Sequence, residues 1–97
     1  MVTKIKNEML GSLRGSENII NYINMPLVIT EVMFQEGNFG EVALIKAQLP
    51  DKSEKILRTG SKVIIKQIRA LLEQKIPLPW LVKVIRVKRY ITFAEVD

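Results

Sequence analysis

The sequence predicts a mainly β fold, a small barrel of five strands with one helix between the third and fourth strands. Three observations lead to this prediction. Short segments rich in β-branched residues alternate with turns that contain Gly, Pro or Asn, as in compact β domains. One later segment repeats its apolar residues with the period of a helix. The length of 97 residues fits a single domain with a single core.

A helical arm is expected at residues 1–25, before the first strand. Apolar residues recur there at helical spacing in two short stretches, which residues 11–16 separate. Ser16 followed by Glu17 is typical of a helix start and predicts the N-cap of the second stretch. The arm is interpreted either as a segment that packs on the domain or as a lid or oligomerisation arm.

Three strands are expected next, over residues 27–35, 41–49 and 54–59. Residues 36–40 join the first two strands and contain two glycines that can adopt positive φ angles, so this pair is predicted to form a hairpin. Residues 50–53, with the sequence Pro-Asp-Lys-Ser, predict a second turn before the third strand.

The single long helix is expected over residues 61–74. Its apolar side chains fall on one side and its Lys and Arg side chains on another, which is the pattern of an amphipathic helix. Ser61 or Thr59 is placed to cap its start, and two prolines shortly after it prevent its continuation. Trp80 follows these prolines and is expected to cover the end of the helix.

Two final strands are expected over residues 81–87 and 90–96, joined by a tight turn at residues 88–89. The alternation of polar and apolar residues in the first of them slips at residues 84–85. A slip of this kind predicts a β-bulge.

This order of elements is that of the OB-fold, a five-stranded Greek-key barrel whose second and third strands and adjoining loops bind oligonucleotides or oligosaccharides. Residues 26–97 would form this OB-type domain. An antiparallel α+β sandwich with the same elements remains the alternative, because the sequence indicates the order of the strands and not the closure of the sheet.

The residue types exclude several kinds of chemistry. The chain has no Cys and no His, and therefore lacks thiolate ligands, disulfides and the commonest general base. No spacing of carboxylates is typical of a metal-dependent nuclease, so we expect no enzymatic activity, no metal and no cofactor. No apolar run reaches the roughly 18 to 20 residues of a membrane span, and the N-terminus lacks the apolar core of a signal peptide. We therefore expect a cytoplasmic protein without a membrane partner.

Positive charge is concentrated in one part of the chain. Residues 55–89 contain ten Lys or Arg and one Glu, a net charge of +9, whereas the rest contains five basic and nine acidic residues, which gives +5 overall. Because this segment is also rich in Val, Ile and Leu, we expect it to be folded and to expose one basic face that binds an anion.

Single-stranded nucleic acid is bound by cations that follow the phosphates and by flat side chains on which bases stack. On the second and third strands, the polar side chains predicted to face outward and bind are Lys46, Gln48, Lys55 and Arg58. Arg58 is the strongest candidate, because a guanidinium can hold a phosphate and also stack on a base. The alternative for Arg58 is an ion pair with a neighbouring carboxylate.

The helix and the last hairpin supply further candidate cations, which are Lys62, Lys66, Arg86, Lys88 and Arg89. Lys62, Lys66 and Arg69 follow one another at spacings of four and three residues and therefore share one face of the helix, which could continue the track of phosphate contacts. A solvated surface is the alternative interpretation of that face.

Two of the aromatic residues are predicted to stack on bases. Phe39 lies between Asn38 and Gly40 at a hairpin tip, where a core position is hard to arrange. Tyr90 lies at the last hairpin, where the loop between the fourth and fifth strands of an OB barrel meets nucleic acid. Phe34 and Phe93 have apolar neighbours on their strands and are expected in the core.

A family resemblance covers residues 26–93. The segments 34–41, 58–63 and 88–93, and above all the Arg-Thr-Gly-Ser-Lys sequence from Arg58 to Lys62, resemble the small single-stranded DNA-binding proteins of OB type that phages, archaeal viruses and plasmids carry. The resemblance implies sequence-tolerant binding of single-stranded DNA in the replication or recombination of a small genome. For a viral protein it also implies location in the host cytoplasm.

Two other functions remain open. An OB barrel that binds RNA would use the same cations and aromatic residues. A structural or interaction protein would instead use the basic face to dock an acidic partner, or the N-terminal arm to form a homo-oligomer.

Overall fold

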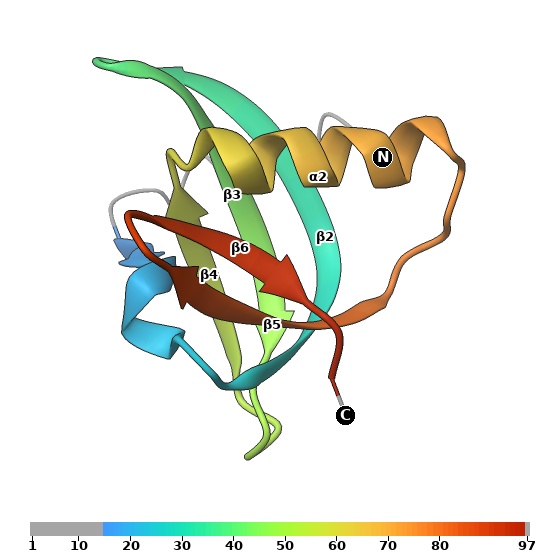
Figure 1. Cartoon of the computed structure of the whole chain (residues 1–97). Coiled ribbons are helices and arrows are strands. Elements are labelled where there is room, and N and C mark those ends of the chain that lie inside the picture. Colours follow the sequence, from blue (N-terminus) through green and yellow to red (C-terminus); the bar gives the residue numbers. More distant parts are fainter. Residues whose placement is uncertain (1–14, 97) are drawn as a thin grey trace.

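A computed structural model of the chain describes residues 15–96, so the first of the two expected arm stretches lies outside the described residues. The elements are β1 (Glu17–Asn18), the 3-10 helix η2 (Ile19–Tyr22), β2 (Pro26–Gly37), β3 (Gly40–Gln48), β4 (Glu54–Thr59), α2 (Lys62–Glu73), β5 (Trp80–Val87) and β6 (Tyr90–Ala94). The strands form one curled sheet in the order β1-β4-β3-β2-β5-β6, and α2 lies across one end of it (Figure 1). The fold is therefore mainly β and barrel-like, as the sequence predicts.

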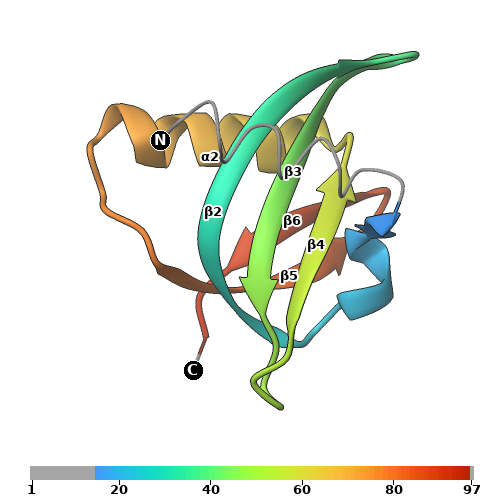
Figure 2. The same cartoon turned by 180° about the vertical axis from the view of Figure 1, so that it is seen from behind.

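The long strand β2 joins the two halves of the sheet. Its residues from Val28 onward pair antiparallel with β3, and Pro26 to Ile29 also pair antiparallel with β5. The register with β3 shifts between Ile29 and Glu31, which is a bulge that lets the strand bend. Figure 2 shows the resulting curvature of β2 and β3. Because of this bend, β5 and β6 face β4 across the core.

The prediction of five strands with the helix after the third is wrong in its strand count and in the place of the helix. The sheet has six strands and α2 follows the fourth, because Glu17 and Asn18 pair in parallel with β4. Ser16 is not the N-cap of a helix; Asn18 is, and its side chain accepts a hydrogen bond of 3.1 Å from the amide of Ile20. A strand of two residues contains no alternation of polar and apolar residues, so no sequence pattern marks it.

The segment after β1 also belongs to the fold. Ile19 is fully buried, and Ile23 forms a parallel bridge with Val84 of β5. The amide of Asn24 donates to the carbonyl of Val84 at 2.7 Å. Of the described part of the expected arm, residues 15–25, the stretch from residue 17 onward is therefore built into the sheet and its core.

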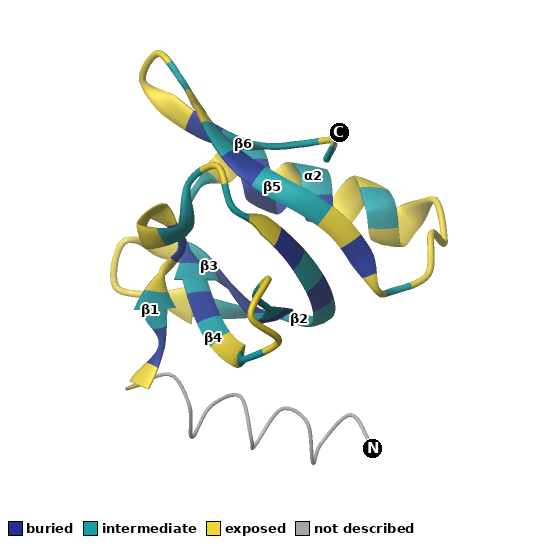
Figure 3. Ribbon diagram, turned by 90° about the horizontal axis from the view of Figure 1, so that it is seen from below, coloured by how far each residue is buried: buried dark blue, intermediate teal, exposed yellow. Residues whose placement is uncertain are grey.

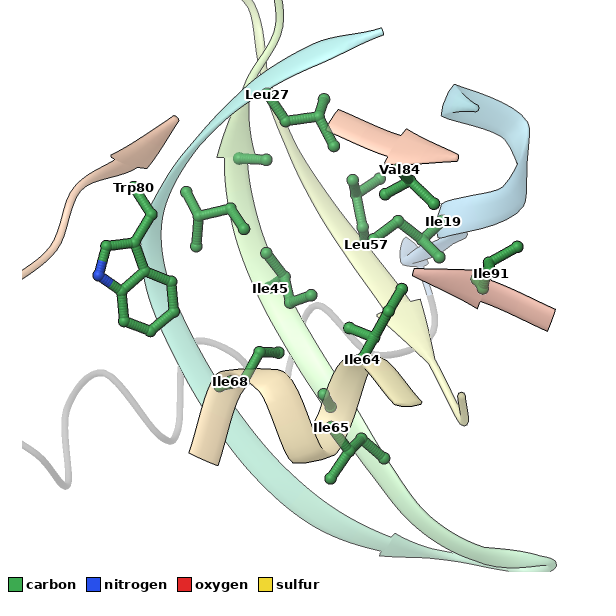
Figure 4. Close-up of a cluster of buried hydrophobic side chains, with 13 residues drawn as sticks. Ile19, Leu27, Ile45, Leu57, Ile64, Ile65, Ile68, Trp80, Val84 and Ile91 are labelled. Carbon is green, nitrogen blue, oxygen red and sulfur yellow. The ribbon is translucent and has the colours of Figure 1, made fainter. Parts of the chain in front are cut away.

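The core lies inside the curled sheet and under α2 (Figure 4). Its fully buried large side chains include Ile19, Leu27, Ile29, Ile45, Leu57, Ile64, Ile68 and Val84. Phe34 and Phe93 pack against this cluster, as expected. Trp80 is buried, and its indole N–H donates to the carbonyl of Ile76 at 3.1 Å, just beyond the end of α2. The tryptophan thus covers the helix end, as its position after the prolines predicts.

The prediction of a β-bulge at residues 84–85 is wrong. The pairing of β5 with β6 runs without a shift from Lys83 and Ala94 to Val87 and Tyr90. The apparent slip arises because Ile85, which follows the buried Val84, is an apolar residue on the outer face of the sheet.

Helix α2 covers the outer edge of β6. Ser61 caps the helix by accepting a hydrogen bond of 3.2 Å from the amide of Ile64, and its hydroxyl lies 3.4 Å from the carbonyl of Ile91 in β6. One turn later, the side-chain oxygen of Gln67 accepts a hydrogen bond of 3.0 Å from the amide of Phe93. Side chains of the helix thus satisfy backbone groups that an edge strand would otherwise expose.

Candidate nucleic-acid interface

A first cleft opens between the β5–β6 hairpin, η2 and the start of α2. It has a volume of about 370 Å³ and is lined by Ile20, Ser61, Lys62, Val63, Arg86, Arg89, Tyr90 and Ile91. Figure 3 shows that the hairpin beside it is exposed at its tip. Three of these lining residues are cations and none is acidic, so this space, named here the β5–β6 cleft, favours an anion.

A second cleft lies between the tip of the β2–β3 hairpin and α2. It has a volume of about 350 Å³ and is lined by Phe39, Gly40, Glu41, Gly60, Lys62, Ile65, Lys66 and Arg69. Phe39 is fully exposed at the tip. Gly40 follows it with a φ of 120°, a conformation that favours glycine and allows the tight turn. This β2–β3 cleft shares Lys62 with the β5–β6 cleft, so the two are neighbours.

Arg69 attaches the β2–β3 hairpin to α2. Its guanidinium donates to the carboxylate of Glu41 in β3 and lies 4.2 Å from the centre of the Phe34 ring in β2. This distance is within the range of a cation–π contact. Because Glu41 offsets the charge of Arg69, Lys62 and Lys66 supply the net positive charge of the β2–β3 cleft.

Seven of the predicted site residues come together around these clefts. We name them the basic band, and they are Phe39, Lys62, Lys66, Arg86, Lys88, Arg89 and Tyr90. Lys88 lines neither cleft but is exposed in the hairpin turn next to Arg89. The band runs from one hairpin tip, across the start of α2, to the other hairpin.

Three other predicted residues lie away from the band. Gln48 of β3 pairs with Glu54, the first residue of β4, and Lys55 is the residue after Glu54. Gln48 and Lys55 therefore both lie near the turn that joins β3 to β4. The clefts lie at the opposite end, where β4 leads into α2 (Figure 1). Lys46 is half-buried in the middle of β3, opposite Glu31 of β2. None of the three lines either cleft.

Arg58, the strongest candidate from the sequence, has a partner inside the fold. Its guanidinium donates to the backbone carbonyl of Ser16, and also to the Ser16 hydroxyl at 3.2 Å. Ser16 is buried and directly precedes β1. Arg58 therefore holds the segment before β1 against β4. Its partners are the backbone carbonyl and the hydroxyl of Ser16, and not the carboxylate that the alternative interpretation gave it.

Sequence reasoning selected neither Ile20 nor Glu41 for the site, and it named Arg69 only as part of the helix face that also carries Lys62 and Lys66. Ile20 lies in the segment expected to form an arm, 41 to 71 residues before the other residues of its cleft, and no local pattern links it to them. Arg69 shares a helix face with Lys62 and Lys66, a spacing that the sequence does show. Its pairing with Glu41 could not be read from the sequence, because it depends on the approach of the hairpin to the helix.

Among the described residues, two ionisable groups have shifted pKa values, and both lie outside the two clefts. A hydrogen bond to the Glu17 carboxylate raises the pKa of Tyr22, and hydrogen bonds from Ser53 lower the pKa of Asp51. Among residues 15–96, no three His, Cys, Asp or Glu side chains are grouped closely enough to hold a metal ion.

Comparisons with models of protein families, with curated proteins and with solved structures found no match to this chain. Within the described part of the chain, no helix has the length and apolar character needed to cross a membrane.

Proposed function

We propose that this chain binds single-stranded DNA with little sequence preference, through the basic band of an OB-type barrel, as a component of replication or recombination. The observation that carries the proposal is the arrangement of the two clefts. Each combines an exposed aromatic side chain, Phe39 or Tyr90, with cations, and the two clefts meet at Lys62.

The topology supports the assignment to the OB type. When the two-residue β1 is set aside, five longer strands remain, with α2 between the third and the fourth of them. The first of the five pairs with both the second and the fourth, which is compatible with an OB barrel. In that assignment, the hairpins that carry Phe39 and Tyr90 are the two loops through which OB barrels bind oligonucleotides.

The chemistry of the band supports an unpaired strand as the ligand. Lys and Arg side chains neutralise phosphates irrespective of sequence, and every base has a flat face that can stack on an aromatic ring. In a duplex the bases are already stacked on one another, so Phe39 and Tyr90 would find no free face. The band thus favours single strands over duplexes.

Fluorescence anisotropy with labelled oligo-dT at two salt concentrations tests the proposal. We expect micromolar or tighter binding that weakens steeply with salt, and weaker binding of a duplex of equal length. Absence of binding at low salt would exclude the proposed function. Competition with a matched RNA oligomer and with heparin separates the alternatives. If heparin competes as well as DNA, the basic band is an unspecific surface for polyanions. If RNA binds more tightly than DNA, the chain is an RNA-binding protein.

A further inference from the structure

The wall of the β5–β6 cleft includes apolar side chains that are only partly buried against the rest of the protein. Ile20 of η2 is 43% exposed and Tyr90 of β6 is 47% exposed, and both line this cleft. They come from elements far apart in the sequence, and Ile23 holds η2 against β5 through its bridge to Val84. Two apolar side chains are thus fixed on one cleft, with part of each left in contact with water.

The rest of the cleft wall has the opposite character. Lys62, Arg86 and Arg89 line the same space, and no lining residue among those described is acidic. A ligand that satisfies both surfaces must carry a flat apolar face and a negative charge close together. A nucleotide has this combination, because its base stacks and its phosphate pairs with cations.

The volume of the cleft sets the size of the ligand. At about 370 Å³ it lies at the small end of the roughly 300–1,000 Å³ typical of small-molecule sites. A cleft of this size has room for one nucleotide.

We propose that the β5–β6 cleft is a subsite for one nucleotide of the bound strand, with the base stacked on Tyr90 and in contact with Ile20, and its phosphates on Lys62, Arg86 and Arg89. The inference rests on the proposed function and adds to it a discrete base-binding position. It also gives η2 a direct role in binding, because the segment supplies one wall of the subsite.

Methyl NMR of the full chain with labelled isoleucine tests the subsite. The probes are oligo-dT and an oligomer of equal length that carries abasic sugars in place of every base, each added at low salt to saturation as followed by anisotropy. Oligo-dT should shift the Ile20 methyl signals through the ring current of the base, and the abasic oligomer should leave them nearly unchanged. Ile76 is the matched control, since it is 40% exposed but lies beyond the far end of α2, a helix of 12 residues that is about 18 Å long and begins at Lys62.

Affinity measurements with two variants complete the test. Ile20→Ala should weaken the binding of oligo-dT about fivefold or more while binding of the abasic oligomer stays the same, and Ile76→Ala should change neither. Binding of oligo-dT with unmoved Ile20 signals, or equal binding of the two oligomers by the unmodified chain, would overturn the subsite and leave single-strand binding intact. Failure of oligo-dT to bind at all would instead overturn the proposed function, and the subsite with it.

Discussion

At the scale of single residues, exposure separates the aromatic side chains into two groups. Phe34 and Phe93 pack against the core, whereas Phe39 is fully exposed at the tip of the β2–β3 hairpin. An exposed phenyl ring contributes nothing to the core, so its removal should leave the stability of the fold nearly unchanged. Phe39 is therefore a residue whose effect on binding can be measured separately from its effect on folding.

We predict that Phe39→Ala weakens binding of oligo-dT by about 1–3 kcal/mol, the usual contribution of one base stacked on an aromatic side chain. The melting temperature should change little. Leu81→Ala is the control, because Leu81 is 57% exposed and lies on β5 outside both clefts. Anisotropy titrations and thermal melts of the two variants check the prediction, and equal losses of affinity would contradict it.

Arg58 belongs to a different class, since its guanidinium donates to the carbonyl and hydroxyl of the buried Ser16. We predict that Arg58→Ala lowers the free energy of unfolding by about 1.5–3 kcal/mol, the range for hydrogen bonds to charged groups. Urea denaturation measures this loss.

The comparison variant for Arg58 is Lys62→Ala. Lys62 is exposed at the first position of α2 and lines both clefts, so its removal should weaken binding and spare stability. A stable Arg58→Ala variant with strongly reduced DNA binding would show instead that Arg58 contacts the strand, as the sequence alone predicts.

At the scale of the elements, the sequence predicts segments whose patterns are long enough to be periodic. The helix was expected over residues 61–74 and is observed from Lys62 to Glu73 with Ser61 as its cap. The third strand is observed as predicted, over residues 54–59, and the other main strands differ by one or two residues at their ends. Apolar periodicity and turn residues carry this information.

Two features were beyond prediction at this scale. Strand β1 has two residues and exists only because Glu17 and Asn18 meet β4, some 40 residues away in the sequence. The bulge lies in β2 between Ile29 and Glu31. The slip at residues 84–85 was misleading, because an apolar residue on an outer face gives the same pattern as a bulge.

The contact between α2 and the edge of β6 gives a prediction at this scale. Gln67 accepts a hydrogen bond from the amide of Phe93, and Gln67→Ala removes that acceptor. We predict faster hydrogen exchange at the Phe93 amide and a loss of stability of about 1 kcal/mol. Exchange measured by NMR checks this, with Gln74→Ala beyond the end of α2 as control. Unchanged protection of Phe93 in the Gln67 variant would show that the helix does not hold this edge.

At the scale of the whole molecule, the topology decides which predicted site residues can act together. The sequence places the positive charge in residues 55–89 but does not show at which end of the sheet each cation lies. Lys55 is the second residue of β4 and Lys62 follows the end of that strand, so the strand itself separates these two lysines. The curvature of β2 then brings the last hairpin next to the start of α2. The candidate site is therefore smaller than the sequence predicts and includes residues 20, 41 and 69.

The salt dependence of binding measures how many of the cations contact phosphates. Each phosphate contact to a single strand contributes a slope of about −0.7 to the plot of log affinity against log salt concentration. The basic band contains five cations, which are Lys62, Lys66, Arg86, Lys88 and Arg89. If each neutralises one phosphate, the slope for the unmodified chain should be about −3.5.

Charge-neutral variants then locate the contacts one at a time. We predict that Lys62→Gln and Arg89→Gln each reduce the size of the slope by about 0.7 and weaken binding at low salt. Lys55→Gln removes the same charge from the opposite end of β4 and should leave the slope unchanged, because its distance from the clefts prevents contact with the same phosphates. Anisotropy titrations over a series of salt concentrations give all three slopes. If Lys55→Gln reduced the slope as much as Lys62→Gln does, the bound DNA would follow the outer face of β3 and β4 instead of the basic band. A path of phosphates over that face would need the cations that line neither cleft.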